Sequence, residues 1–122
     1  MFEFFKSGKD GDAEKKTIRI AFENKDQWQH IVDLSMENTV FIFKHSSRCG
    51  ISSVVLNRFE KQITERDASY FHLHIQGFRE VSNWLAEELN IRHESPQLIV
   101  LKNGKVIGHD SHYALLELMP SL

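Results

Sequence analysis

The sequence TVFIFKHSSRCGIS, residues 39–52, contains the pattern that decides the fold. Its first six residues form a nearly continuous apolar run rich in aromatic and β-branched side chains, which is typical of a strand buried on both faces of a sheet. Apolar residues then recur at spacings of three and four over residues 51–63, which predicts a helix. Ser46 or Ser47 is the expected N-cap of this helix, so Cys49 should lie in its first turn.

The rest of the chain alternates the same two kinds of element. We expect strands over residues 17–22, 69–75, 97–102 and 105–108, and helices over about 26–36, 79–89 and 112–119. Asn103-Gly104 predicts a two-residue hairpin turn, and Ser111 is the expected cap of the last helix. This order implies an α/β fold with a mixed central β-sheet and helices on both of its faces. Residues 1–16 are predicted to be a flexible leader and residues 17–122 a single domain.

Composition excludes several classes of function. The chain has 122 residues, 41% of them hydrophobic and 26% charged, which is ordinary for one globular domain. A formal net charge of -2 argues against a surface for duplex nucleic acid. No apolar run approaches the roughly 20 residues of a membrane span, and no signal-peptide core is present. These features predict a cytoplasmic protein that binds neither nucleic acid nor membrane.

Cys49 is the single cysteine, so it cannot form an internal disulfide or belong to a closed multi-cysteine zinc site. Its predicted place, after a buried strand and at the start of a helix, is the edge where α/β sheets bind ligands. The positive end of a helix dipole and cationic neighbours, here Arg48 and His45, favour the thiolate. We therefore interpret Cys49 as a reactive thiol rather than a packing residue.

Two further positions define the predicted chemistry. Ser52 stands where a dithiol oxidoreductase carries its resolving cysteine, and its hydroxyl can donate to the thiolate. Without a second cysteine, an external small thiol must resolve a mixed disulfide on Cys49. The Ser95–Pro96 bond precedes a buried strand. It is either a cis bond that exposes the Ser95 backbone to a substrate or a plain trans bond that starts the strand.

The chain resembles the monothiol bacilliredoxins, also called bacillithiol-system redox-active proteins. Residues 39–52 resemble that family's active-site segment, and the sequences REVSN (79–83) and HESPQ (93–97) match its second block. The sequences NGK (103–105) and SH (111–112) match its third. The resemblance spans about residues 20–118, and its HESPQ block is quite specific.

The resemblance implies a thioredoxin fold and removal of bacillithiol from S-bacillithiolated proteins. Cys49 would be the nucleophile, and Pro96 the cis-proline beside it. We expect the thiolate to be stabilised by Arg48 and Ser52, and substrate to be bound by Ser47, Gly50, His93, Ser95, Pro96 and His112. The protein would hold no cofactor tightly, use bacillithiol as co-substrate, act on S-thiolated client proteins and be a monomer or weak dimer. Gly50 departs from the family, which commonly has proline there.

Three alternatives belong to other classes. The sequence CGIS also resembles the CGFS motif of monothiol glutaredoxins, which carry iron–sulfur clusters, but the glutathione-binding Gly-Gly-x-x-Asp segment is missing. His72 with His74, or His109 with His112, could offer two metal ligands, although neither pair has an obvious third. In a non-catalytic thioredoxin-like adaptor, Cys49 would be incidental.

Overall fold

The structure, a computed structural model, describes residues 18–122, so the predicted leader lies outside the described part. Its strands are β1 (Ile18–Ala21), β2 (Val40–His45), β3 (Ser69–His74), β4 (Gln97–Lys102) and β5 (Lys105–Ser111). They form one sheet in the order β1-β3-β2-β4-β5. The first three strands in this order are parallel, β4 runs antiparallel to β2, and β5 runs antiparallel to β4. The predicted mixed sheet is confirmed.

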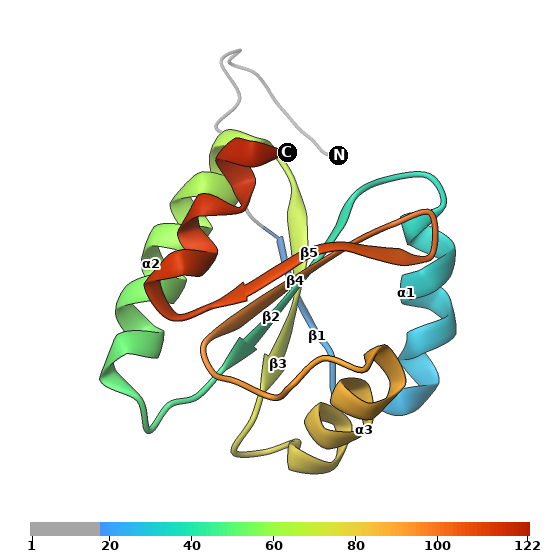
Figure 1. The fold of residues 1–122 in the computed structure, drawn as a ribbon, viewed down its shortest axis with the longest axis horizontal. Helices are drawn as coiled ribbons and strands as arrows, with labels where there is room; N and C mark the ends of the chain where they lie inside the picture. Colours follow the sequence, from blue (N-terminus) through green and yellow to red (C-terminus); the bar gives the residue numbers. More distant parts are fainter. Residues whose placement is uncertain (1–17) are drawn as a thin grey trace, which may run out of the picture.

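Helices cover both faces of the sheet, as predicted (Figure 1). On one face lie α1 (Trp28–Ser35), which follows the 3₁₀ turn η1 (Lys25–Gln27), and α3 (Arg79–Leu89). On the other lie α2 (Gly50–Glu65) and the 3₁₀ segments η2 (His112–Glu117) and η3 (Met119–Ser121). Among the described residues, no helix is long and apolar enough to cross a membrane.

The central strand β2 explains the apolar run of the sequence. Val40 and Ile42 belong to the hydrophobic cluster that contains residues of α1 and α3. Phe41 and Phe43 point to the opposite face, where the Phe43 ring lies 5.1 Å from the ring of Phe59 on α2. Burying each such side chain contributes about 1.5–3 kcal/mol to stability. Two packed faces therefore require apolar side chains at successive positions of β2, and they fix the direction in which the chain leaves it toward Cys49.

The predicted hairpin turn is confirmed, because Asn103 and Gly104 both have positive φ, 53° and 76°. A two-residue turn of type I′ requires such values at both central positions. The following strand is longer than expected and runs to Ser111, where it pairs with Gln97. This continued pairing brings the end of β5 to the same edge of the sheet as the start of β4.

Two helix starts differ from the prediction. The N-cap of α2 is Cys49, in extended conformation, instead of Ser46 or Ser47. Ser46 fails as a cap because its Oγ accepts a hydrogen bond from the Arg48 amide at 3.3 Å, closing a turn ahead of the helix. The last helix is 3₁₀ in form, and the Ser111 side chain makes no capping hydrogen bond. His112, the first residue of η2, has a left-handed φ of 55°, which a regular α-helix does not allow.

Candidate active site

One edge of the sheet collects the predicted site residues. Both β2 and β3 end there, with His45 opposite His74. The antiparallel β4 begins there, with Gln97 opposite Lys44. The loops that leave or enter these strands therefore meet at this edge, and the cis-proline segment lies immediately before β4.

Cys49 lies at the N-terminus of α2 and is partly exposed. Its amide donates to the carbonyl of Ser46 at 3.3 Å, and its carbonyl accepts from the amide of Ser52 at 3.0 Å. As the N-cap of a 16-residue helix, Cys49 stands at the positive end of the helix dipole. Its side chain makes no capping hydrogen bond. The geometry thus holds a thiol where negative charge is stabilised.

Gln76, in the loop after β3, holds the segment before Cys49, and the sequence analysis did not identify it. Its Oε1 accepts from the amide of Ser47 at 2.9 Å and from the Ser47 hydroxyl at 3.2 Å. Its Nε2 donates to Ser46 Oγ at 2.8 Å. One amide side chain therefore binds both serines of the turn. No sequence signal marked it, because the contact depends on the pairing of β2 with β3.

Ser52 is fully buried, and its hydroxyl faces the loop before Cys49. Ser52 Oγ accepts from the amide of Ser46 at 3.1 Å and lies 2.8 Å from His45 Nδ1. The hydroxyl is thus engaged with these two groups rather than with Cys49. Its role as a donor to the thiolate remains a prediction.

The electrostatic surroundings of Cys49 differ from the expectation at His45. Burial lowers the pKa of His45, and the nearby His74 and Arg19 lower it further. The lowered pKa of His45 weakens the positive charge that the sequence analysis expected from it. The exposed Arg48 remains as a cation adjacent to Cys49.

The Ser95–Pro96 peptide bond is cis, which resolves the choice left open by the sequence. Pro96 is buried, and its carbonyl accepts from the amide of His112 at 2.9 Å. His112 Nδ1 lies 3.8 Å from a carboxylate oxygen of Glu94. Ser95, Pro96 and His112 are thus brought together at the active-site edge.

His93 faces the body of the protein. Its Nδ1 lies 3.1 Å from the hydroxyl of Ser82 on α3. Burial lowers the pKa of His93, with further lowering by Lys44 and Arg79. Its predicted role in binding substrate is untested, and these contacts give it a supporting place under the cis-proline loop.

Ser47 and Gly50 remain on the surface beside Cys49. Gly50 is the first residue of α2, and a Cβ built there meets nothing within 4 Å. A proline would suit this position, because Cys49 already has the extended backbone, φ -109° and ψ 116°, that precedes proline. The glycine is therefore not required by space.

His72 and His74, considered above as possible metal ligands, lie beside a third histidine. The rings of His72 and His74 both lie next to that of His45, at centroid distances of 5.5 and 5.9 Å. Within residues 18–122, no group of three or more His, Cys, Asp or Glu side chains is arranged to hold a metal ion.

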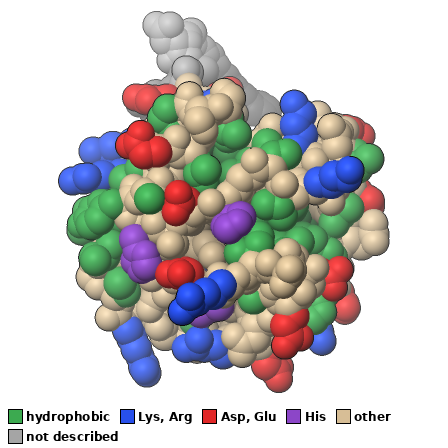
Figure 2. All heavy atoms as spheres, viewed as in Figure 1, with side chains coloured by type: hydrophobic (Ala, Val, Ile, Leu, Met, Phe, Trp, Pro, Cys, Tyr) green, Lys and Arg blue, Asp and Glu red, His purple; other side chains and the backbone are tan. Residues whose placement is uncertain are grey.

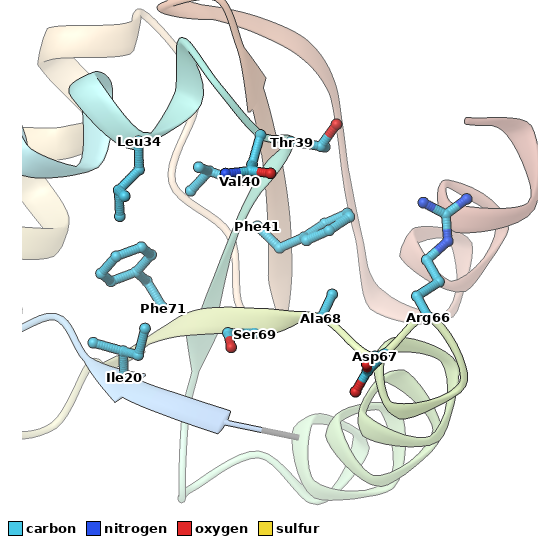
Figure 3. Close-up of a pocket in the computed structure, with 11 residues that line it drawn as sticks. Ile20, Leu34, Thr39, Val40, Phe41, Arg66, Asp67, Ala68, Ser69 and Phe71 are labelled. Atoms are coloured by element: carbon cyan, nitrogen blue, oxygen red, sulfur yellow. The ribbon is translucent and has the colours of Figure 1, made fainter. Parts of the chain in front are cut away.

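A cavity of about 590 Å³ opens at the opposite edge of the sheet (Figure 3). Leu34, Val40, Phe41 and Phe71 line it, together with Arg66 and Asp67 at the end of α2. Because it lies near the starts of β2 and β3, it is separate from Cys49.

Acidic and basic side chains are interspersed on the face shown in Figure 2.

The fold and the single cysteine at this edge define a thiol redox protein of the thioredoxin class. A solved structure described as a thioredoxin-fold oxidoreductase candidate is 29% identical, with a TM-score of 0.74 over 84% of this chain and 94% of that one. Thioredoxin from Nicotiana alata shares the fold at 17% identity, with a TM-score of 0.67 over 91% and 95% of the two chains. Thioredoxin from Trypanosoma brucei brucei does so at 14%, with a TM-score of 0.67 over 90% of each.

Residues 20–118 match the family described as "Monothiol bacilliredoxin BrxC". Because the match covers most of the 122 residues, the chain belongs to this family. The resemblance noted in the sequence is therefore confirmed, and a thiol redox role follows for the protein.

Proposed function

We propose that this protein removes bacillithiol, or a similar small thiol, from mixed disulfides on client proteins through Cys49. The observation that carries the proposal is the place of the single cysteine, at the N-terminus of α2 on the edge shared with cis-Pro96. A lone thiol at such a site can accept a small thiol but cannot release it by forming an internal disulfide. This chemistry suits a bacterial cytoplasm that contains the small thiol at high concentration.

The reaction takes two exchanges. The Cys49 thiolate attacks the bacillithiol sulfur of the mixed disulfide, a new disulfide forms between Cys49 and bacillithiol, and the client leaves as its thiolate. A second bacillithiol thiolate then attacks the bacillithiol sulfur on Cys49, giving bacillithiol disulfide and free Cys49 thiolate. The client cysteine is thereby reduced, and the one free bacillithiol is oxidised as it joins the transferred bacillithiol in a disulfide.

Each part of the site has a role in this proposal. The helix N-terminus and Arg48 stabilise the thiolate before attack and when it leaves. The Ser95 backbone pairs with the extended client segment that bears the disulfide, in the manner of an added strand. We expect Ser47, Gly50 and His112 to contact the small thiol. We expect a monomer or weak dimer to suffice.

The test uses a client protein with one cysteine, loaded in separate samples with bacillithiol, glutathione or cysteine. With a small amount of the protein and excess matching thiol, intact mass should show faster loss of bacillithiol than of the other two. Cys49→Ser should give only the rate of the free thiol, and Ser53→Ala, an exposed change on α2, should keep the full rate. Equal rates with and without the protein would refute the proposal. Faster loss of glutathione than of bacillithiol would mean that glutathione is the small thiol that the protein removes.

A further inference from the structure

We propose that the client protein docks on an exposed face of α2 next to Cys49, and that this face selects clients by their sequence. The α2 docking face consists of Ile51, Val54 and Arg58 of α2 and Tyr113 of η2. The inference rests on the proposed function in taking a mixed disulfide on a protein as the substrate. It goes further by naming the side chains that the preferred client has beside its modified cysteine.

The 3₁₀ segments that follow β5 cover only part of α2. Figure 1 shows η2 and α2 side by side at the left of the molecule. The Leu116 carbonyl accepts from Gln62 Nε2 at 2.9 Å, and the Met119 carbonyl accepts from the Arg66 guanidinium at 3.2 Å. Both contacts lie toward the C-terminal end of the 16-residue helix. The first two turns of α2, which begin beside the active-site cysteine, therefore stay open to a partner.

Apolar side chains stand on these open turns. Ile51 is 39% exposed and Val54 is 41% exposed. Residues three and four apart are neighbours on a helix, so Ile51, Val54 and Arg58 form one continuous row. The Arg58 guanidinium lies over the ring of Tyr113, 5.9 Å from its centroid, and Tyr113 is 49% exposed. The α2 docking face is thus an apolar row that leads from the active site to an arginine stacked on an aromatic ring.

The charge of Arg58 is available to a partner. Within residues 18–122, its guanidinium forms no ion pair with a carboxylate, and its contact is the ring of Tyr113. A docked chain excludes water from such a group and strengthens its attraction for a carboxylate. The row therefore fits a partner that presents an apolar side chain and, further from Cys49, an acidic one.

The geometry of the helix sets the spacing of these two side chains in the client. At about 1.5 Å per residue, Val54 lies about 8 Å and Arg58 about 14 Å along the helix axis from Cys49. An extended chain advances about 3.3 Å per residue, so these positions match the second and fourth residues from the client cysteine. Side chains two residues apart point to the same side of an extended chain. The preferred client thus has an apolar residue two positions from its modified cysteine and an acidic residue four positions from it, on the same side.

The position of the face favours the client over other occupants. Exchange brings the modified cysteine of the client into contact with Cys49, which is partly exposed, so the flanking residues of the client must pass the adjacent surface. A second copy of the chain seated on Ile51 and Val54 would cover Cys49 and stop exchange. Only residues that flank the modified cysteine extend as far as Arg58, so the face discriminates between proteins.

The test uses S-bacillithiolated peptides that differ only in the residues flanking one cysteine. The parent peptide has leucine two positions and aspartate four positions from the cysteine, before it in one version and after it in another. Its variants replace leucine by serine or aspartate by lysine. Each kcat/KM is divided by that for the mixed disulfide of bacillithiol with free cysteine, which lacks flanking residues. For the wild-type protein, one version of the parent should exceed each of its variants at least about threefold.

Two substitutions, each with a matched control, locate the preference on α2. Arg58→Glu should reverse the choice between aspartate and lysine, whereas Lys105→Glu, the same charge reversal on the exposed start of β5, should leave it intact. Val54→Gln should remove the preference for leucine over serine. Ile107→Gln changes a β5 side chain that is 48% exposed and should keep that preference.

The outcomes separate this inference from the proposed function. Turnover of the cysteine mixed disulfide with equal values for all peptides would overturn the inference alone, as would a choice of aspartate that survives Arg58→Glu. No turnover of that small disulfide above the rate without protein would refute the proposed function and the inference with it. Sedimentation of the protein checks for a second copy on the face. A dimer that Val54→Gln dissociates would show that another copy of the chain covers this face and would also overturn the inference.

Discussion

Lys44 offers a quantitative test of how the strand beneath the active site is stabilised. Its side chain is completely buried, and its Nζ donates to the carbonyl of Ser82 at 3.1 Å. Burial lowers its pKa from 10.5 to about 8. Such a change corresponds to about 3 kcal/mol by which the folded protein disfavours the charged amine. Replacing Lys44 by methionine should remove this cost and lose the hydrogen bond to the Ser82 carbonyl, for a net gain of about 1–2 kcal/mol at pH 7.

The sign of the pH dependence follows from the direction of the shift. Between about pH 8 and 10.5 the unfolded chain keeps the Lys44 proton and the folded protein loses it, so the stability of the wild type rises with pH. The advantage of Lys44→Met should therefore shrink by about 1 kcal/mol between pH 7 and pH 9. Urea unfolding of both proteins at these two pH values measures it. A constant difference, or a methionine variant less stable than wild type at pH 7, would refute this reasoning.

Three further changes test other parts of the structure. Gln76→Ala removes three hydrogen bonds to the turn before Cys49 and should cost about 1–2 kcal/mol in thermal unfolding, whereas Gln76→Glu keeps the acceptor for Ser47 and should cost less. An unchanged Tm in the alanine variant would remove Gln76 from the account. Gly50→Pro should raise the free energy of unfolding in urea by about 0.5–1 kcal/mol, with Gly50→Ala as control. A lower free energy of unfolding would show that the Gly50 amide is needed. Burial lowers the pKa of His72 to about 4, so acidifying from pH 7 to 5 should cost the wild type about 1 kcal/mol after allowance for solvent screening. In urea unfolding, His72→Phe should lack that loss, and an equal loss in both proteins would contradict the assignment.

The sequence alone predicted the structure correctly wherever the local pattern agrees with the packing. The apolar run over residues 39–44 predicted a strand buried on both faces, and β2 packs against both helical layers. Asn103-Gly104 predicted its turn because few other residue pairs adopt positive φ twice in succession. The single cysteine after β2 located the active-site edge, because that edge follows from strand order alone.

Contacts between distant loops could not be predicted in this way. Gln76 binds the turn before Cys49 from a loop almost thirty residues further along the chain, and a lone glutamine has no characteristic spacing. The approach of His45 to Ser52 depends on how α2 packs over β2. The misplaced N-cap has the same origin, because the hydroxyl of Ser46 is used within the preceding turn.

The site has two parts, the turn that holds Cys49 and the cis-proline segment, and different contacts hold each of them. Main-chain geometry places Cys49 at the helix N-terminus, and side chains from neighbouring loops hold that geometry. The cis-proline segment is fixed separately, through the pairing of β4 and β5 and the contact of His112 with Pro96. Substitutions in one part should therefore affect thiol reactivity, and substitutions in the other should affect substrate docking.

The most direct test of the central claim is the intact mass of the protein after a single turnover. One equivalent of reduced protein is mixed with one equivalent of S-bacillithiolated client, without free bacillithiol, and the reaction is stopped with acid. The account predicts that the protein gains the mass of one bacillithiol on Cys49 in the same amount as client thiol is released. Client release with no adduct on Cys49, or a covalent protein–client disulfide in place of the bacillithiol adduct, would contradict it.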